Sequence, residues 1–157
     1  ITFYKTIQNK FHYAITGNTA AEIVYKRVDS KKENMGLTTW ENSPDGKILK
    51  SDVIIAKNYL NEQEIKNLNN LVNLFLDIAE NNAERSITMY MEDWKNEVEN
   101  ALKVFHYEVL EGKGKISHKQ AVEKAENEYE KYKVIQDKNY VSDFDRLLSE
   151  TKQIENK

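Results

Sequence analysis

Residues 61–79, NEQEIKNLNNLVNLFLDIA, decide the fold class of this 157-residue chain. Asn61 and Glu64 have the spacing of a capping box, in which two side chains satisfy backbone N–H groups at the start of a helix. The apolar residues that follow recur every three or four positions and cover more than one helical face: Ile65, Leu68, Leu71, Val72, Leu74, Phe75, Leu76, Ile78 and Ala79. The stretch predicts a long helix at the centre of a helical protein.

Helical spacing continues on both sides of this stretch. The further helices that it predicts lie at about 3–15, 19–28, 51–58, 88–110, 117–136 and 141–154. Two of them begin with a capping box, Thr19 with Glu22 and Ser117 with Gln120, and Gly17 is placed to end the first. Residues 53–55 are β-branched and could form a strand, but no clear second strand exists to pair with it. We therefore predict an all-α fold of six or seven helices in one domain spanning residues 1–157.

Residues 29–50, DSKKENMGLTTWENSPDGKILK, interrupt the helical pattern. Pro44, the only proline, and Gly46 belong to a turn sequence. An irregular stretch of this length is long for a compact domain, so we expect a functional loop or a small ordered excursion. Trp40 in its middle either plugs the loop onto the helical body or lines a ligand or partner site.

The composition excludes several classes of protein. With no Cys and only three His, the chain is neither a disulfide scaffold nor a classical zinc finger. No apolar run approaches the roughly 20 residues that span a bilayer, and no signal peptide is present, which favours a cytoplasmic protein. A net charge of −3 argues against a dominant phosphate-binding surface. A local basic patch in residues 1–60 stays possible.

One group of polar residues that could carry chemistry lies in the first two predicted helices. His12 could act as a base or bind a polar ligand if it meets Thr19 and Glu22 in space. The alternative is that His12 has an ordinary structural role. No pair of His has the spacing of a metal site, so neither a metal nor a cofactor is predicted.

A second group flanks the irregular loop. Asp52, Lys57 and Asn58 lie on the short helix predicted at 51–58, with Lys50 just before it and Tyr59 just after it. The first amides of this helix and Lys50 could face an anion. A helix cap surrounded by surface lysines explains the same residues. The sequence contains no nucleotide-binding loop and no nucleophile elbow, so an enzyme is the less favoured interpretation.

Several blocks along the chain resemble the RhuM family of bacterial virulence-associated proteins. The blocks are Thr6–Ile23, Asn34–Trp40, Lys50–Leu60, Met89–Trp94, Gly114–Lys119, Ala125–Asp137 and Ser142–Asp145, in that order. Asn18 departs from the family pattern, which usually has His at this position.

The resemblance implies that the chain is the C-terminal part of a longer protein. A first residue that is Ile rather than Met agrees with a fragment. In the family the preceding part resembles a DNA-binding module, and members are typically encoded on genomic islands or beside restriction–modification genes. The family has no established reaction to assign to individual residues.

Three functions remain open at this point. The first is a helical domain that oligomerises or recruits a protein partner, with the 141–154 helix and the Trp40 loop as its surfaces. The second is an enzyme of unknown activity with a pocket around His12, Glu22, Trp40 and Lys57, joined by Thr19 and Tyr59. The third is direct nucleic-acid binding by the basic first third of the chain.

Overall fold

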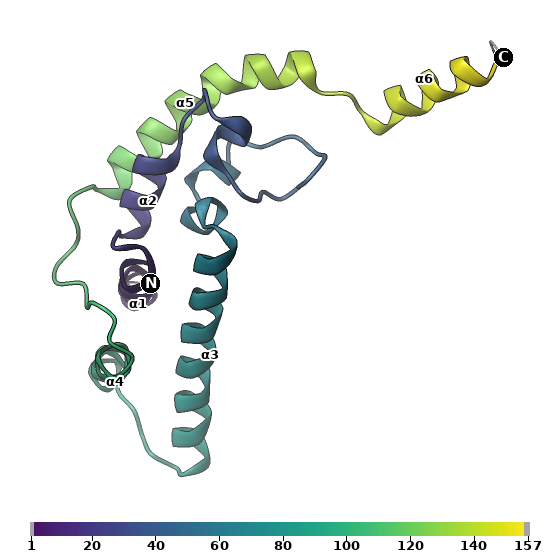
Figure 1. Ribbon diagram of the computed structural model, residues 1–157. Helices are drawn as coiled ribbons and strands as arrows, with labels where there is room; N and C mark the ends of the chain where they lie inside the picture. The colour runs from purple at the N-terminus through teal and green to yellow at the C-terminus, as the bar shows by residue number, and fades with distance from the viewer. Residues whose placement is uncertain (1, 156–157) are drawn as a thin grey trace.

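The chain folds into helices joined by irregular connections, in a computed structural model that describes residues 2–155 (Figure 1). Within that range there is no strand, so the predicted all-α class is confirmed. The α-helices are α1 (Thr2–Thr16), α2 (Ala20–Arg27), α3 (Glu62–Glu84), α4 (Met91–Val104), α5 (His118–Asn139) and α6 (Asp143–Glu155). Three short 3-10 helices lie between α2 and α3: η1 (Glu33–Gly36), η2 (Asp52–Ile54) and η3 (Ala56–Tyr59).

The helix starts follow the predicted caps. Thr19, Asn61 and Ser117 each accept a hydrogen bond from the third helical residue, whose side chain accepts one from the cap backbone. Gly17 takes a φ of 71° after α1 and its N–H donates to the Tyr13 carbonyl at 2.8 Å. These bonds join residues three or four positions apart, which is why the sequence alone located them.

The main core lies where α2 packs against α5 and the 3-10 helices (Figure 1). Ala121 and Ala125 stand one turn apart on α5 and are both buried, so the two helix backbones can approach closely. Val53, Tyr59 and Leu60 close the other side of this core. The short α2 is therefore the most enclosed helix of the chain, although its sequence is only moderately apolar.

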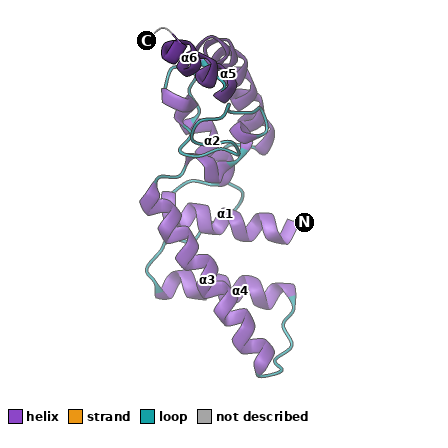
Figure 2. Ribbon diagram, turned by 90° about the vertical axis from the view of Figure 1, so that its right-hand side faces the viewer, coloured by secondary structure: helices purple, strands orange, loops and turns teal. Residues whose placement is uncertain are grey.

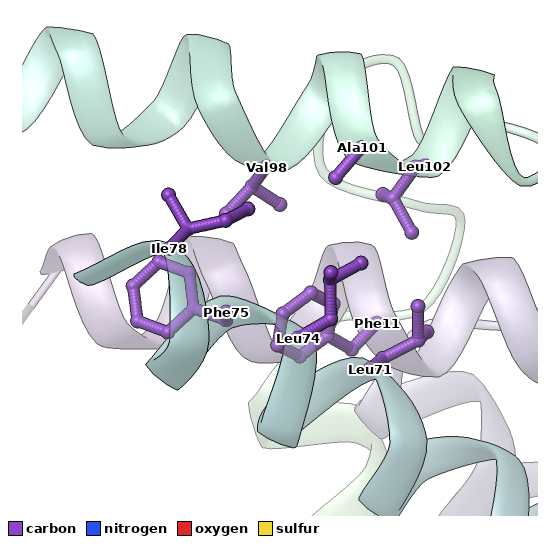
Figure 3. Close-up of a pocket in the computed structure, with 8 residues that line it drawn as sticks. All are labelled: Phe11, Leu71, Leu74, Phe75, Ile78, Val98, Ala101 and Leu102. Carbon is purple, nitrogen blue, oxygen red and sulfur yellow. The ribbon is translucent and has the colours of Figure 1, made fainter. Parts of the chain in front are cut away.

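A second layer holds α1, α3 and α4, which Figure 2 shows grouped below α2 and α5. A chain of edge-to-face rings joins the three helices, with Phe11 and Phe75 centroids 6.3 Å apart and Phe75 and Trp94 centroids 5.3 Å apart. The slot between them is lined by apolar side chains, Phe11, Leu71, Leu74, Phe75, Ile78, Val98, Ala101 and Leu102 (Figure 3). Its volume of about 10 Å³ is about that of one water probe, so it is a packing gap rather than a ligand site.

The structure corrects the prediction that α3 is central. The helix lies along one side of the molecule, and its neighbours α1 and α4 cover only part of its wide apolar arc (Figure 1). Leu76 is 55% exposed and Val72 is 37% exposed. Apolar residues on more than one face led to the wrong expectation, because a helix longer than its neighbours keeps part of that surface in water.

Two predicted helix boundaries are also wrong. Residues 51–58, predicted as one short helix, form η2 and η3 with an extended residue, Ile55, between them. The helix predicted to reach Leu110 ends at Val104, and His106 beyond it has a φ of 61°, outside helical geometry. Apolar residues continue past that end because they pack as a loop, with Leu110 buried.

The irregular stretch predicted at 29–50 is confirmed, apart from the single turn of η1. Backbone groups of the loop, at Ile48 and at Ser30, are hydrogen-bonded to side chains of α5. Gln136 accepts a hydrogen bond from the Ile48 N–H at 2.7 Å and donates one to the Ile48 carbonyl at 3.1 Å. The Glu128 carboxylate accepts from the Ser30 N–H at 2.7 Å. The loop therefore has a defined position against α5.

Candidate functional site

Of the first group of candidate residues, Thr19 and Glu22 form a structural junction. The two Glu22 carboxylate oxygens accept hydrogen bonds from the N–H groups of Thr19, at 3.0 Å, and Lys115, at 2.6 Å. Burial opposes ionisation, but these two N–H donors hold the pKa of Glu22 below its usual value. The carboxylate thus joins the start of α2 to the connection before α5.

His12 lies on the buried face of α1, and its Nδ1 atom has no hydrogen-bond partner in the protein. Burial lowers the pKa of His12 to about 4, so the imidazole is neutral at pH 7. The carboxylate expected to assist it, Glu22, already accepts two backbone N–H groups. A catalytic role for His12 remains an untested hypothesis.

The second group of candidates holds the backbone of the 3-10 segment together. The Asn58 amide donates to the Asp52 carbonyl at 3.0 Å, and the Tyr59 hydroxyl donates to the Val53 carbonyl at 2.6 Å. Burial raises the pKa of Tyr59. Lys57 is exposed beside them.

Two of the three charged residues of the predicted anion site, Lys50 and Asp52, have protein partners. The Lys50 ammonium lies 3.6 Å from a Glu126 carboxylate oxygen and 4.0 Å from one of Glu130 on α5. The Asp52 carboxylate accepts hydrogen bonds from the N–H groups of Leu49 and Glu41. These contacts fasten the loop and the 3-10 segment to their neighbours.

Trp40 borders a depression in the surface. Its indole N–H donates to the Gly46 carbonyl at 2.8 Å, which closes the loop on itself, and the ring is nearly buried. The depression has a volume of about 180 Å³ between the loop and the end of α5. Its lining mixes apolar and polar groups: Asn34, Trp40, Pro44, Asp45, Gly46, Lys47, Ile48, Tyr132, Ile135, Gln136, Asn139 and Tyr140. It is the size of one large side chain rather than of a metabolite pocket.

Exposed apolar side chains continue from this depression to Ile154. We call residues 134–154 the C-terminal arm. Its large apolar side chains are 39% to 75% exposed: Val134, Ile135, Tyr140, Val141, Phe144, Leu147, Leu148 and Ile154. Figure 1 shows α6 projecting away from the other helices. On α6 the apolar residues recur at helical spacing and share one face.

The arm was only partly foreseen from the sequence. The 141–154 helix and the Trp40 loop were predicted as partner surfaces, but the exposed pair Val134 and Ile135 was not. Their signal was an apolar pair in a largely polar stretch of α5, of which only Ile135 was assigned to the core stripe of the predicted helix. Among residues 2–155 no helix is long and apolar enough to cross a membrane, and no cluster of His, Asp or Glu has the arrangement of a metal site.

Comparison with known proteins identifies one family. The sequence model described as "Virulence protein RhuM family" matches residues 1–141, which cover most of the chain. No curated protein and no solved structure matches the chain. The matched range includes the Trp40 depression and ends at Val141, just before α6.

Proposed function

Because this chain belongs to the RhuM family of virulence proteins, we propose that its helical fold is an assembly module. In this proposal the C-terminal arm binds a protein surface, either another subunit or a different partner. The observation that carries the proposal is the unpartnered apolar face of α6, where Phe144 is 67% exposed and Leu147 is 61% exposed.

Exposed apolar side chains that gather on one helix face favour a contact surface. Monomeric proteins rarely present a continuous apolar patch beyond a few hundred Å², and larger patches usually mark a contact surface. The residues are also spaced as in helices that bind by one face, at i, i+3, i+4 and i+7 from Phe144 through Leu147 and Leu148 to Thr151. A helix that binds a partner is expected to be amphipathic, with an apolar face that its own chain leaves uncovered.

We further propose that the arm serves a DNA-binding module that lies outside this sequence. The family resemblance supports this division of labour, since the present chain is weakly acidic and DNA affinity rests on clustered cations. Assembly of two or more chains would bring two such modules together. That arrangement matches proteins that read paired DNA sites.

The enzyme alternative lacks an arranged set of catalytic groups among the described residues. Glu22, Asn58 and Tyr59 each hold a backbone group in place, and Trp40 borders a depression at the arm. We therefore keep it as the second hypothesis and give the arm priority.

The proposal is tested by measuring the mass of the chain in solution. We expect light scattering to give a mass above 18.4 kDa, or a host protein identified by mass spectrometry to be retained on the immobilised chain. Leu147→Asp should abolish either form of binding, because it places a charge in the apolar face. Gln153→Glu, on the opposite side of α6, should leave it unchanged. A monomer that retains no Leu147-dependent partner contradicts the proposal.

A further inference from the structure

We infer that the partner of the C-terminal arm is the same arm of a second copy of this chain, paired antiparallel about a two-fold axis at Val141. The inference rests on the proposed function and specifies its partner. It predicts that α6 of one copy lies over the end of α5 and the Trp40 depression of the other.

The first reason is the symmetric placement of the exposed residues. Val134 and Ile135 precede Val141 by seven and six positions, and Leu147 and Leu148 follow it by six and seven. All four side chains are 42% to 61% exposed. An antiparallel pairing centred on Val141 therefore places the leucines of one copy against Val134 and Ile135 of the other, twice in one dimer. A self-complementary patch of this kind is what a two-fold interface requires.

The second reason is the direction of the arm. α6 leaves the end of α5 through residues 140–142 and continues away from the rest of the molecule (Figure 1). It therefore cannot cover Val134 and Ile135 of its own chain in this conformation. A second copy that approaches from the opposite direction can cover both pairs at once.

The third reason is the amount of surface. Burial removes roughly 150–250 Å² of surface for a large aromatic side chain and roughly 60–120 Å² for Val, Leu or Ile. The two aromatic and six aliphatic residues of the arm, about half exposed, therefore present on the order of 500 Å² per copy. A standard stable interface buries about 800 Å² per partner. The apolar side chains of the arm therefore supply more than half of the surface that a specific dimer needs, and polar residues at its rim add to it.

The fourth reason is charge. Residues 131–138 carry three Lys and one Asp, whereas residues 143–152 carry three acidic and two basic groups. The two segments thus have opposite net charge, +2 and −1. In the antiparallel register Glu150 of one copy falls between Lys133 and Lys131 of the other, and Lys131 is also paired with Glu128 of its own chain at 2.8 Å. Asp137, which falls opposite Asp145, is already paired with Lys47 at 2.8 Å.

The depression gives the dimer a pocket for a side chain of the second copy. Ile135 and Tyr132 line it together with Trp40, and its volume of about 180 Å³ can hold one leucine-sized side chain. In the register proposed, Leu147 and Leu148 of the second copy lie closest to Ile135. The loop that forms one side of the depression is held by the two hydrogen bonds between Gln136 and Ile48. The pocket is therefore formed before the second copy binds.

Two charged variants test the pairing on the complete 157-residue chain. Leu147→Glu and Val134→Lys both change exposed residues, so circular dichroism should show an unchanged fold. We expect sedimentation equilibrium to show a dimer of the unmodified chain and a dissociation constant at least tenfold weaker for each variant. Gln153→Glu is the matched control and should dimerise normally.

Mixing the two variants tests the register. In the antiparallel pairing, a mixed dimer brings the carboxylate introduced by Leu147→Glu beside the ammonium introduced by Val134→Lys at one contact. The other contact keeps its native residues. We therefore expect native mass spectrometry of the mixture to show mixed dimers in excess over either homodimer. A parallel pairing would place position 134 of one copy near position 134 of the other, and likewise for position 147. Mixing the two variants would then not restore dimerisation.

The remaining outcomes separate this inference from the proposed function. A dimer unaffected by both variants, or unaided by mixing, overturns the inference. A monomer that binds a different, Leu147-dependent protein also overturns it but supports the proposed function. A monomer without such a partner contradicts both.

Discussion

Gly114 is the residue at which the connection before α5 touches the start of α2. A Cβ atom built there would lie 2.6 Å from Thr19 Cγ2 and 2.9 Å from Glu22 Oε1, and the backbone has a φ of 79°. Gly112, two residues earlier, has nearly the same φ of 80° but no heavy atom within 4 Å of such a Cβ. Substitutions at the two glycines therefore separate the free-energy cost of the backbone conformation from the cost of side-chain crowding.

We predict that Gly114→Ala destabilises the chain clearly more than Gly112→Ala. The shared cost of a left-handed non-glycine residue is about 1–2 kcal/mol, and crowding at the Thr19–Glu22 cap adds about 1–3 kcal/mol. Urea denaturation of both variants measures the difference. Equal losses in the free energy of unfolding would show that the Thr19–Glu22 cap shifts to accommodate the added methyl group without an energetic penalty.

His12 gives a pH-dependent contribution to stability whose sign follows from burial. Its pKa in the fold is about 4, below the ordinary value of 6.5. Between these values the unfolded chain binds a proton that the folded chain does not, so the free energy of unfolding falls as pH decreases from 6.5 to 4. Above this range the group contributes no pH dependence.

We predict that His12→Gln removes this dependence. The free energy of unfolding of the unmodified chain, relative to the variant, should fall by up to about 3 kcal/mol between about pH 7 and about pH 4. Urea denaturation at several pH values measures it. A constant difference across this range would mean that His12 keeps an ordinary pKa in the folded protein.

Individual helices depend on their ends as much as on their apolar faces. At the start of α3 the Asn61 side chain accepts a hydrogen bond from the Glu64 N–H at 2.8 Å, and the Glu64 carboxylate accepts from the Asn61 N–H at 3.0 Å. The same carboxylate accepts two hydrogen bonds from Arg27 at the end of α2, at 2.6 Å and 2.8 Å. This cap therefore also fixes α3 relative to α2.

We predict that Asn61→Ala lowers the free energy of unfolding by about 1 kcal/mol, the usual cost of losing an N-cap side chain. Asn69→Ala, on the exposed face within α3, is the matched control and should be neutral or slightly stabilising, because Ala is the better helix former. Thermal or urea unfolding compares the two. Equal effects would argue against a stabilising role for the cap.

The whole molecule divides into a packed body and an arm whose apolar face lies in water. The body is held by the α2–α5 core and the aromatic contacts of α1, α3 and α4. None of residues 143–154 of α6 belongs to the buried core. Binding through the arm would therefore stabilise the chain by mass action rather than by internal packing.

We predict that removal of residues 143–157 leaves the Tm of dilute protein nearly unchanged and abolishes its dependence on concentration. For the complete chain the Tm should rise with protein concentration, because dimerisation favours the folded state. Differential scanning fluorimetry over a roughly hundredfold concentration range measures both. A strong loss of Tm in dilute truncated protein would show that α6 contributes to the fold of the single chain.

The candidate site was predictable only in part. The 141–154 helix and the Trp40 loop were expected at a partner surface. The structure places Trp40 in the same depression as Ile135 and Tyr140, at the start of the exposed arm. Thr19 and Glu22 were expected near a pocket and instead hold a backbone junction with Lys115, a residue 93 positions from Glu22. No local pattern indicates a hydrogen bond between residues so far apart.

The sequence by itself determined the all-α class and where most helices begin, because capping bonds and apolar spacing act over three or four residues. It did not determine which apolar faces are covered. Leu71 and Leu76 fit the same helical pattern in α3, yet one is buried and the other exposed, since neighbouring helices cover only one of them. Only the tertiary structure decided that α2 is enclosed, that α3 lies along one side and that the apolar face of α6 is left in water, because burial depends on contacts between segments distant in the chain.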